Sequence, residues 1–357
     1  MLIQRSVAKV ASKIIAQVGR GSQPPFDNGG FLHVHLLHTA IATDNIGDEI
    51  ITQGCLDSLG EVFPSAYIST SSSHDGLGVV SRHMAEAADI VILTGTNALA
   101  PFYQVGKDFI WNVSSQDLDV LRNKVVLMGV GANRTYDRLD RRQIDFLRNI
   151  LSDDYFHSVR DDLGKEICEA AGKRVLNTSC PTLWGVGDNP GVTHDSEVKQ
   201  VCFTLTAHKP DPSDRIFMEI LAERYERLFF FPQQPRDLSY LKKINPKITI
   251  DVVAPRLTAY DELLLREEID VIGTRLHGTI RGLQHGKRAI VISIDNRALG
   301  LSKTTGLTVV ERDQIGELRN VASSDINSEL RIPSAEIETF LGQFQLRQLG
   351  GTLASNP

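Results

Sequence analysis

Residues 269–294 constrain the fold of this chain more than any other stretch. The segment opens with a short apolar run, residues 269–272, which is typical of a strand buried on both faces. After a polar corner, Leu276, Ile280 and Leu283 recur at helical spacing. The chain then resumes with a second apolar run that resembles another buried strand. The pattern predicts a βαβ unit and therefore a parallel sheet.

Arg275 and His277 occupy the corner between this strand and its helix. Ligands of parallel α/β sheets bind beyond the carboxyl ends of the strands, and helix N-termini favour anions. A guanidinium matches a carboxylate or phosphate, and an imidazole can donate to an anion or move a proton near neutral pH. The two side chains therefore indicate an anion site. The alternative is structural, with Arg275 in an ion pair and His277 capping the helix.

The composition limits what kind of protein carries this site. At 357 residues the chain is longer than one core usually serves, so two domains are expected. The net charge of −6 excludes a global basic field that would attract nucleic acid, so positive charge must be local. The four cysteines are scattered without metal-ligand spacing, which favours a reducing compartment. We expect no bound metal and no cofactor.

Residues 1–20 have a composition of their own. Their apolar residues recur at helical spacing, and all of their charges are basic. Such a helix packs on its own domain, rests on a membrane surface or serves as an organelle transit peptide. No apolar run of the chain is long enough to span a membrane. We expect a cytoplasmic protein, with peripheral contact at the inner face of the membrane as an open alternative.

Strand and helix patterns alternate twice along the chain. We predict two doubly wound, Rossmann-like α/β domains that face each other across a cleft. The expected divisions are an N-terminal helix and loop over residues 1–30, a first domain over 31–185, a linker over 186–196, a second domain over 197–333, and a C-terminal helix and tail over 334–357.

Arg160 follows a predicted strand of the first domain, at a corner of the same kind as that of Arg275. Because the two corners belong to different domains, their guanidinium groups can converge on one doubly anionic ligand. The alternative is a surface ion pair between Arg160 and Asp161 or Asp162.

Other polar side chains stand at corners of the first domain. Asp48 and Glu49 fall in the first turn of a helix that begins at Asn45, where carboxylates stabilise the positive end of the helix dipole. The same position also allows one of them to face the cleft as a proton-transfer group. Asn97 and Asn133 follow the next buried strands, where small neighbours let a ligand approach the backbone.

Four short motifs make the chain similar to the polysaccharide pyruvyl transferase family. They are Asn45-Ile-Gly-Asp-Glu49, Ser158-Val-Arg-Asp161, the segment 177–183 with its proline, and Arg275-Leu-His-Gly278. The resemblance implies a two-domain fold of the glycosyltransferase B type. It also implies transfer of the pyruvyl group of phosphoenolpyruvate to sugar hydroxyls of a cell-surface polysaccharide or its precursor, forming a pyruvate ketal and releasing phosphate.

By this resemblance the donor site consists of Arg160, Arg275, His277 and Gly278. Phosphoenolpyruvate carries a phosphate and a carboxylate, which suit two guanidinium groups and a helix N-terminus. Ketal formation protonates the enol methylene while a hydroxyl attacks C2, and charge develops on the leaving phosphate. We expect His277 to bind the phosphate and act as general acid. At one further corner, residues 295–297 read Asp-Asn-Arg, which departs from the Tyr and Lys arrangement of the family.

On the acceptor side, we expect Asn45, Asn97 and Asn133 to bind a sugar, oligosaccharide or lipid-linked glycan. Asp48 or Glu49 is expected to deprotonate its hydroxyl. Two other functions remain open. One is a nucleotide-sugar-dependent glycosyltransferase of the same architecture, because the same groups hold a diphosphate equally well. The other is a non-catalytic glycan-binding protein that has kept the fold.

Overall fold

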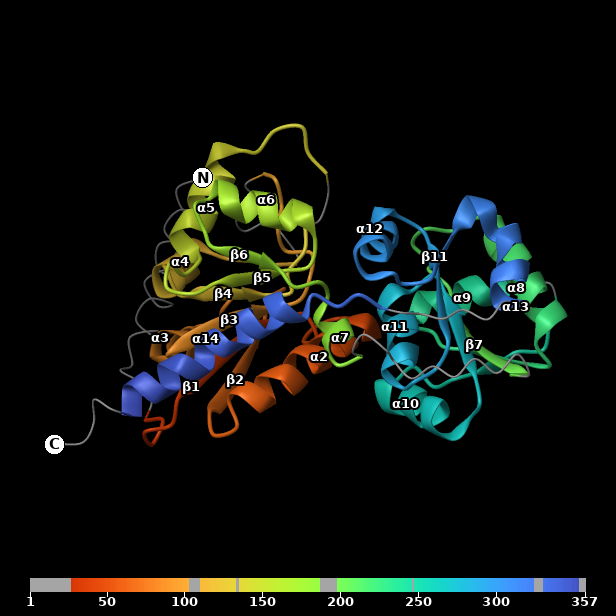
Figure 1. The fold of residues 1–357 in the computed structure, drawn as a ribbon, viewed down its shortest axis with the longest axis horizontal. Coiled ribbons are helices and arrows are strands. Elements are labelled where there is room, and N and C mark those ends of the chain that lie inside the picture. Colours follow the sequence, from red (N-terminus) through yellow and green to blue (C-terminus); the bar gives the residue numbers. More distant parts are fainter. Residues whose placement is uncertain are drawn as a thin grey trace, which may run out of the picture.

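A computed structural model gives the fold as two α/β halves that lie side by side (Figure 1). Some expectations stay predictions because they fall outside the residues that the structure describes. They concern the predicted N-terminal helix, Asn133 and almost all of the predicted linker. The structure describes residues 27–102, 110–132, 135–186, 198–245, 247–323 and 330–352.

The first half is built on a parallel sheet of four strands in the order β2-β1-β3-β4. A short parallel pair, β5 and β6, continues beside β4 through a backbone bridge between Val130 and Val159. The strands are β1 (His33–His38), β2 (Tyr67–Ser72), β3 (Ile90–Thr94), β4 (Val125–Met128), β5 (His157–Val159) and β6 (Val175–Asn177). The helices are α2 (Ile46–Val62), α3 (Val79–Ala87), α4 (Ser115–Leu121), α5 (Arg141–Ile150), α6 (Asp162–Ala170) and α7 (Pro181–Trp184).

The second half is a parallel sheet of six strands in the order β12-β11-β10-β7-β8-β9. The strands are β7 (Gln200–Thr204), β8 (Arg227–Phe230), β9 (Asp251–Val252), β10 (Asp270–Gly273), β11 (Ala289–Ser293) and β12 (Val309–Glu311). The helices are α8 (Ser213–Arg224), α9 (Pro235–Ile244), α10 (Leu257–Arg266), α11 (Leu276–Gln284), α12 (Asn296–Thr305), the 3-10 helix η1 (Arg312–Glu317) and α13 (Leu318–Ser323). Strand order reverses between β7 and β10, which creates the crevice where doubly wound sheets bind ligands.

Burial on both faces explains why the central strands β10 and β11 read as continuous apolar runs. Successive side chains of a strand point to opposite faces, and in β10 Val271 belongs to one hydrophobic core while Ile272 belongs to the other. Both residues are fully buried. The predicted class, two doubly wound α/β domains facing a cleft, is confirmed.

The last helix, α14 (Ser334–Thr352), lies across the first half (Figure 1). Phe344 is buried there against Phe63 and Tyr155, with ring centroids 5.2 and 5.5 Å apart. The Gln343 amide also makes two hydrogen bonds to the backbone of Phe156, at 2.7 and 3.1 Å. The C-terminal helix therefore completes the core of the half to which it is most distant in sequence.

The two halves meet through α2, α7 and α11. The backbone N–H of Ile46 donates to the carbonyl of Gln233 at 3.0 Å, and the Gln284 amide donates to the carbonyl of Thr182 at 2.7 Å. These bonds connect the start of α2 and the end of α11 to the opposite half. Within the described ranges no helix is both long and apolar enough to cross a membrane.

Candidate functional site

Two adjoining cavities lie beyond the carboxyl ends of the strands, between the two halves. The larger has a volume of about 690 Å³ and is lined by residues of both halves, among them Arg160 and Cys180. The smaller has a volume of about 170 Å³ and is lined by Asn45, Gln233 and Arg275 among others. The residues that line both cavities are Leu276, His277, Asp295 and Arg297.

Arg160 follows β5 and lines the larger cavity. Its Nη2 donates to Oδ1 of Asn97, while Nη1 is buried and has no hydrogen-bond partner among the described residues. Gly131 makes room for this side chain, because a Cβ there would lie 2.5 Å from Arg160 Nε. Arg160 thus has a neutral hydrogen-bond partner, and its guanidinium forms no ion pair within the described residues.

The proposed ion pair between Arg160 and its neighbours is not formed in the described part of the chain. Asp161 caps α6 instead, where its carboxylate accepts from the N–H groups of Gly164 at 2.7 Å and Ala132 at 3.2 Å. Burial raises the pKa of Asp161. Asp162 accepts a hydrogen bond from the Asn177 amide at 2.8 Å.

His277 is the second residue of α11 and lies where the two cavities meet. The residue is half-buried because it lines both cavities, yet its imidazole lies deep between the halves. This burial, with smaller contributions from the charges of Arg160 and Arg297, holds the pKa of His277 well below its usual value. The imidazole is therefore neutral near pH 7. Its Nε2 lies 3.7 Å from Sγ of Cys180.

Arg275 is the N-cap residue of α11 and faces only the smaller cavity. Its Nη2 lies 2.7 Å from Oδ1 of the buried Asp237 and donates to Oε1 of Gln234 at 2.6 Å. Nε also bonds to Asp237, at 3.1 Å. Arg275 therefore forms the structural ion pair that was the alternative to anion binding. Asp237 balances the charge of its guanidinium before any ligand binds.

Glycines make the β10 corner compact. At Gly273 a Cβ would lie 2.0 Å from Thr204 Oγ1 of the neighbouring strand, so only glycine fits. At Gly278 a Cβ would lie 1.7 Å from Nε2 of Gln233. That amide nitrogen is buried without a hydrogen-bond partner in the described structure. Gly278 thus contributes by leaving space for Gln233 between the N-termini of α2 and α11.

Asp48 and Glu49 lie in the first turn of α2, but neither lines the two cavities. Asp48 accepts hydrogen bonds from Thr43 Oγ1 at 2.6 Å and Asn45 Nδ2 at 3.3 Å, and burial raises its pKa. Glu49 is exposed. The geometry gives Asp48 a role in shaping the start of α2.

The asparagines predicted to bind an acceptor differ in position. Asn45 caps α2, accepting from the Gly47 N–H at 3.1 Å, and lines the smaller cavity. Asn97 lines the larger cavity and holds Arg160. Asn133 lies outside the described residues.

Sequence reasoning did not assign Arg297 and Lys209 to the site, although both line the larger cavity. Arg297 Nη2 lies 2.8 Å and Lys209 Nζ lies 3.0 Å from the Asp295 carboxylate. Burial alone would raise the pKa of Asp295, but these two cations hold it well below its usual value. Arg297 follows the end of β11, which is the same signal that identified Arg160 and Arg275. Cys180, Gln233 and Asp237 carried no comparable signal.

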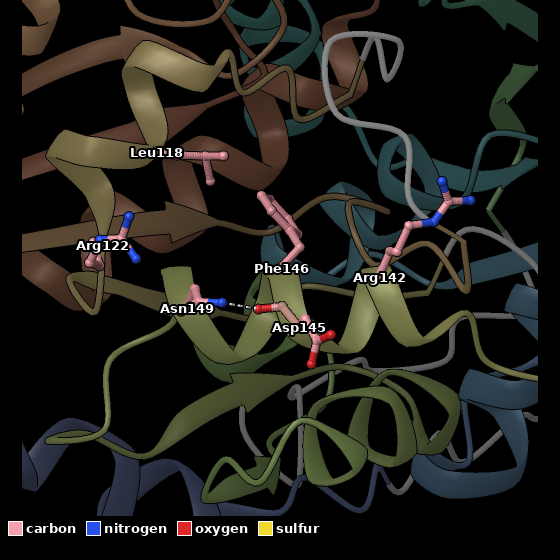
Figure 2. A pocket seen from close by; sticks show the side chains of 6 residues that line it. All are labelled: Leu118, Arg122, Arg142, Asp145, Phe146 and Asn149. Carbon is pink, nitrogen blue, oxygen red and sulfur yellow. Dashed lines mark hydrogen bonds between the residues drawn. The ribbon is translucent and has the colours of Figure 1, made fainter.

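A third hollow, of about 330 Å³, lies away from the cleft on α4 and α5 (Figure 2). Figure 2 shows Leu118 and Phe146 between Arg122 and Arg142, with the Asn149 amide hydrogen-bonded to the backbone of Asp145. Both arginines are exposed and pair with neighbouring aspartates. None of the predicted site residues lines this hollow.

Metal-ligating side chains do not gather in the described ranges, which contain no group of three or more His, Cys, Asp or Glu residues suited to an ion. The cleft offers instead guanidinium, ammonium and imidazole groups. These groups bind anions and move protons.

Comparison with known proteins places these features in a family. The model of the family described as polysaccharide pyruvyl transferase matches residues 45–296. No curated protein matches the chain in sequence.

Similar folds occur among solved structures. A crystal structure of a UDP-N-acetylglucosamine 2-epimerase has a TM-score of 0.51 and 11% identity, covering 91% of this chain and 97% of that one. The UDP-GlcNAc 2-epimerase of Methanocaldococcus jannaschii has a TM-score of 0.49 and 10% identity, covering 90% of this chain and 99% of that one. At such identities a likeness shows the fold alone, and the first of these structures confirms the expected architecture of the glycosyltransferase B type.

Proposed function

Because the chain belongs to the polysaccharide pyruvyl transferase family, we propose that it transfers the pyruvyl group of phosphoenolpyruvate to sugar hydroxyls, forming a ketal and releasing phosphate. Family membership makes the chain a transferase that acts on a sugar or polysaccharide acceptor. The donor, the ketal and the residues that act on them are the proposal.

The observation that carries the proposal is the meeting of Arg160, His277 and Arg297 in the larger cavity. Arg160 comes from the first half and the other two from the second, so the donor would bind where both halves contact it. The volume of about 690 Å³ exceeds that of a three-carbon phosphate ester and leaves space for a sugar beside it. Arg275 supports this site from the smaller cavity, where Asp237 already balances its charge.

The low pKa of His277 suits a general acid that is charged only when the donor is present. Burial and two nearby cations disfavour its protonated form in the free protein. Phosphate and carboxylate groups bound between those cations would cancel their effect and raise the pKa of His277 towards neutrality. The proton would then be available at the place where the enol accepts it.

The proposed ketal formation has two steps. In the first, the enol methylene carbon gains a proton from His277, one sugar hydroxyl oxygen bonds to C2, and that hydroxyl loses its proton. In the second, another hydroxyl of the sugar bonds to C2 as the C2–O bond to phosphate breaks, and its proton leaves with the phosphate. Cations beside the phosphate stabilise the charge that develops in this step.

The acceptor hydroxyl must lose its proton to a base. Asp48 and Glu49, which the motif suggested, lie outside both cavities. The carboxylates that line the larger cavity are Asp161, Asp162 and Asp295. Asp161 caps a helix and Asp295 pairs with two cations, so we propose Asp162 as the alternative base.

Calorimetry with the purified protein tests the donor. We expect phosphoenolpyruvate to bind in competition with inorganic phosphate, and the Arg160→Ala variant to bind it at least tenfold more weakly. The matched control is Arg142→Ala, which removes an exposed arginine of the third hollow. Binding of UDP in place of phosphoenolpyruvate would instead support the glycosyltransferase, and the absence of both would support the non-catalytic glycan-binding protein.

A further inference from the structure

Cys180 is a buried thiol that lines the larger cavity and contacts His277. Its Sγ lies 3.7 Å from Nε2 of His277, within the range of a hydrogen bond to sulfur. The two residues come from opposite halves and are 97 positions apart in sequence. The contact therefore depends on how the halves meet.

Three constraints fix the segment that carries Cys180. Gly129 has a left-handed φ of 65°, and a Cβ there would lie 2.1 Å from Cγ of Pro181, so the proline ring packs directly on the end of β4. The Trp184 indole N–H donates to the carbonyl of Thr178 at 2.8 Å. The Gln284 amide binds the carbonyl of Thr182 at 2.7 Å, which ties the segment to α11.

The groups around Cys180 limit the hydrogen bonds that its sulfur can make. Thr182 Oγ1 lies 3.1 Å from Cys180 Sγ and donates to it. Sulfur has two lone pairs and the thiol also carries a proton, so the contact with His277 has two forms: Nε2–H donates to Sγ, or the thiol donates to Nε2. A neutral imidazole that accepts at Nε2 carries its proton on Nδ1. No residue of the described structure bonds to Nδ1, so that N–H is free to meet a ligand.

We propose that Cys180 is a positioning residue, whose thiol holds His277 in the tautomer that presents Nδ1–H to the donor phosphate. The catalytic meaning of this assignment rests on the proposed function, because a phosphate offers only acceptors near neutral pH. The opposite tautomer would aim a lone pair at those oxygens and repel them. The thiol thus decides whether the neutral ring attracts or repels the donor as it enters, before His277 gains its second proton.

Nitrogen-15 NMR of histidine-labelled protein tests the assignment without any substrate. The His277 signals are identified as those missing from a His277→Gln variant. We expect the Nδ1–H tautomer in the wild type and in Cys180→Ser, whose hydroxyl also donates, and its loss in Cys180→Ala. Cys202→Ala, which removes a fully buried thiol from β7, serves as the control and keeps the wild-type pattern. An unchanged tautomer in Cys180→Ala, or its loss in Cys180→Ser, would overturn the proposal.

Kinetics provide a second test. At pH 7.5 we expect kcat of Cys180→Ala to fall about tenfold or more, with recovery in Cys180→Ser. The deficit of the alanine variant should shrink as the pH falls, because the imidazolium carries protons on both nitrogens whatever the tautomer. A uniform loss at every pH would contradict the positioning role. If the wild type does not turn over phosphoenolpyruvate, the proposed function fails while NMR still decides the role of Cys180.

Discussion

Arg160 and Arg275 occupy equivalent corners of the two halves, after β5 and β10, but their surroundings differ. Arg160 bonds to the neutral Asn97 and has a buried Nη1 without a partner among the described residues. Arg275 forms a buried ion pair with Asp237. The position of a residue in a parallel sheet predicts that it reaches the cleft, but its neighbours decide whether its charge is available to a ligand.

The largest effect is expected on the free energy of unfolding when Arg275, at the corner after β10, is replaced. Replacing Arg275 by Ala leaves the Asp237 carboxylate buried and unpaired, which should lower the free energy of unfolding by about 3–5 kcal/mol. Urea denaturation followed by circular dichroism measures this loss. A decrease below about 1 kcal/mol, with donor binding abolished, would make Arg275 a ligand residue like Arg160.

Replacing Arg160, at the corner after β5, should weaken donor binding and leave the free energy of unfolding nearly unchanged. In Arg160→Ala we expect the donor affinity to fall by about 2–3 kcal/mol, because a charge-assisted hydrogen bond is lost. The free energy of unfolding should change by less than about 1 kcal/mol, since no ion pair of the described structure is broken. Calorimetry and denaturation of the same preparation measure both quantities. Wild-type donor affinity in this variant would exclude Arg160 from the site.

Asn97→Asp should give Arg160 a carboxylate partner like the one that Arg275 has in Asp237. The new carboxylate would neutralise Arg160 as Asp237 neutralises Arg275, so we expect donor affinity to fall about tenfold. Asn97→Ala is the matched control, because it removes the same hydrogen bond without adding charge. A stronger loss in the alanine variant would show that Asn97 acts by orienting Arg160 and not by sparing its charge.

The pH dependence of binding tests the charge that Arg160 and Arg297 impose on His277. Burial and these cations hold the pKa of His277 below 6.5 in the free protein, and a bound anion raises it, so binding takes up a proton. Donor affinity should rise as the pH falls through the pKa of the complex, by up to about 1.4 kcal/mol per pH unit. It should level off below the pKa of the free protein. Calorimetry in buffers of different ionisation enthalpy measures the uptake, and an affinity independent of pH would contradict it.

The smallest effect is expected at the start of α2. Glu49 is exposed and lines neither cavity, so Glu49→Gln should change the turnover rate less than about threefold. Asp162→Asn is the comparison, with a loss of about a hundredfold if that carboxylate takes the acceptor proton. A loss confined to the Glu49 variant would restore the motif residue as the base.

The sequence predicts the positions of the two arginines but not their partners. Apolar runs and the residues that follow them placed Arg160, Arg275 and His277 at the cleft, because strand ends are determined locally. The partners of these residues depend on contacts between distant segments. Asp237 is 38 positions from Arg275, and Cys180 is 97 positions from His277. Local periodicity does not predict contacts between residues so far apart in sequence. The Arg275–Asp237 ion pair and the Cys180–His277 contact are therefore found only in the three-dimensional structure.

The placement of α14 on the first half has a consequence for biosynthesis. Phe340 and Phe344 fill the core around α2, so this half lacks part of its interior until residue 344 has left the ribosome. By contrast, the strands of the second half that the structure describes end by residue 311. The later-translated half can therefore mature first, and the earlier one waits with an uncovered apolar surface that chaperones would recognise.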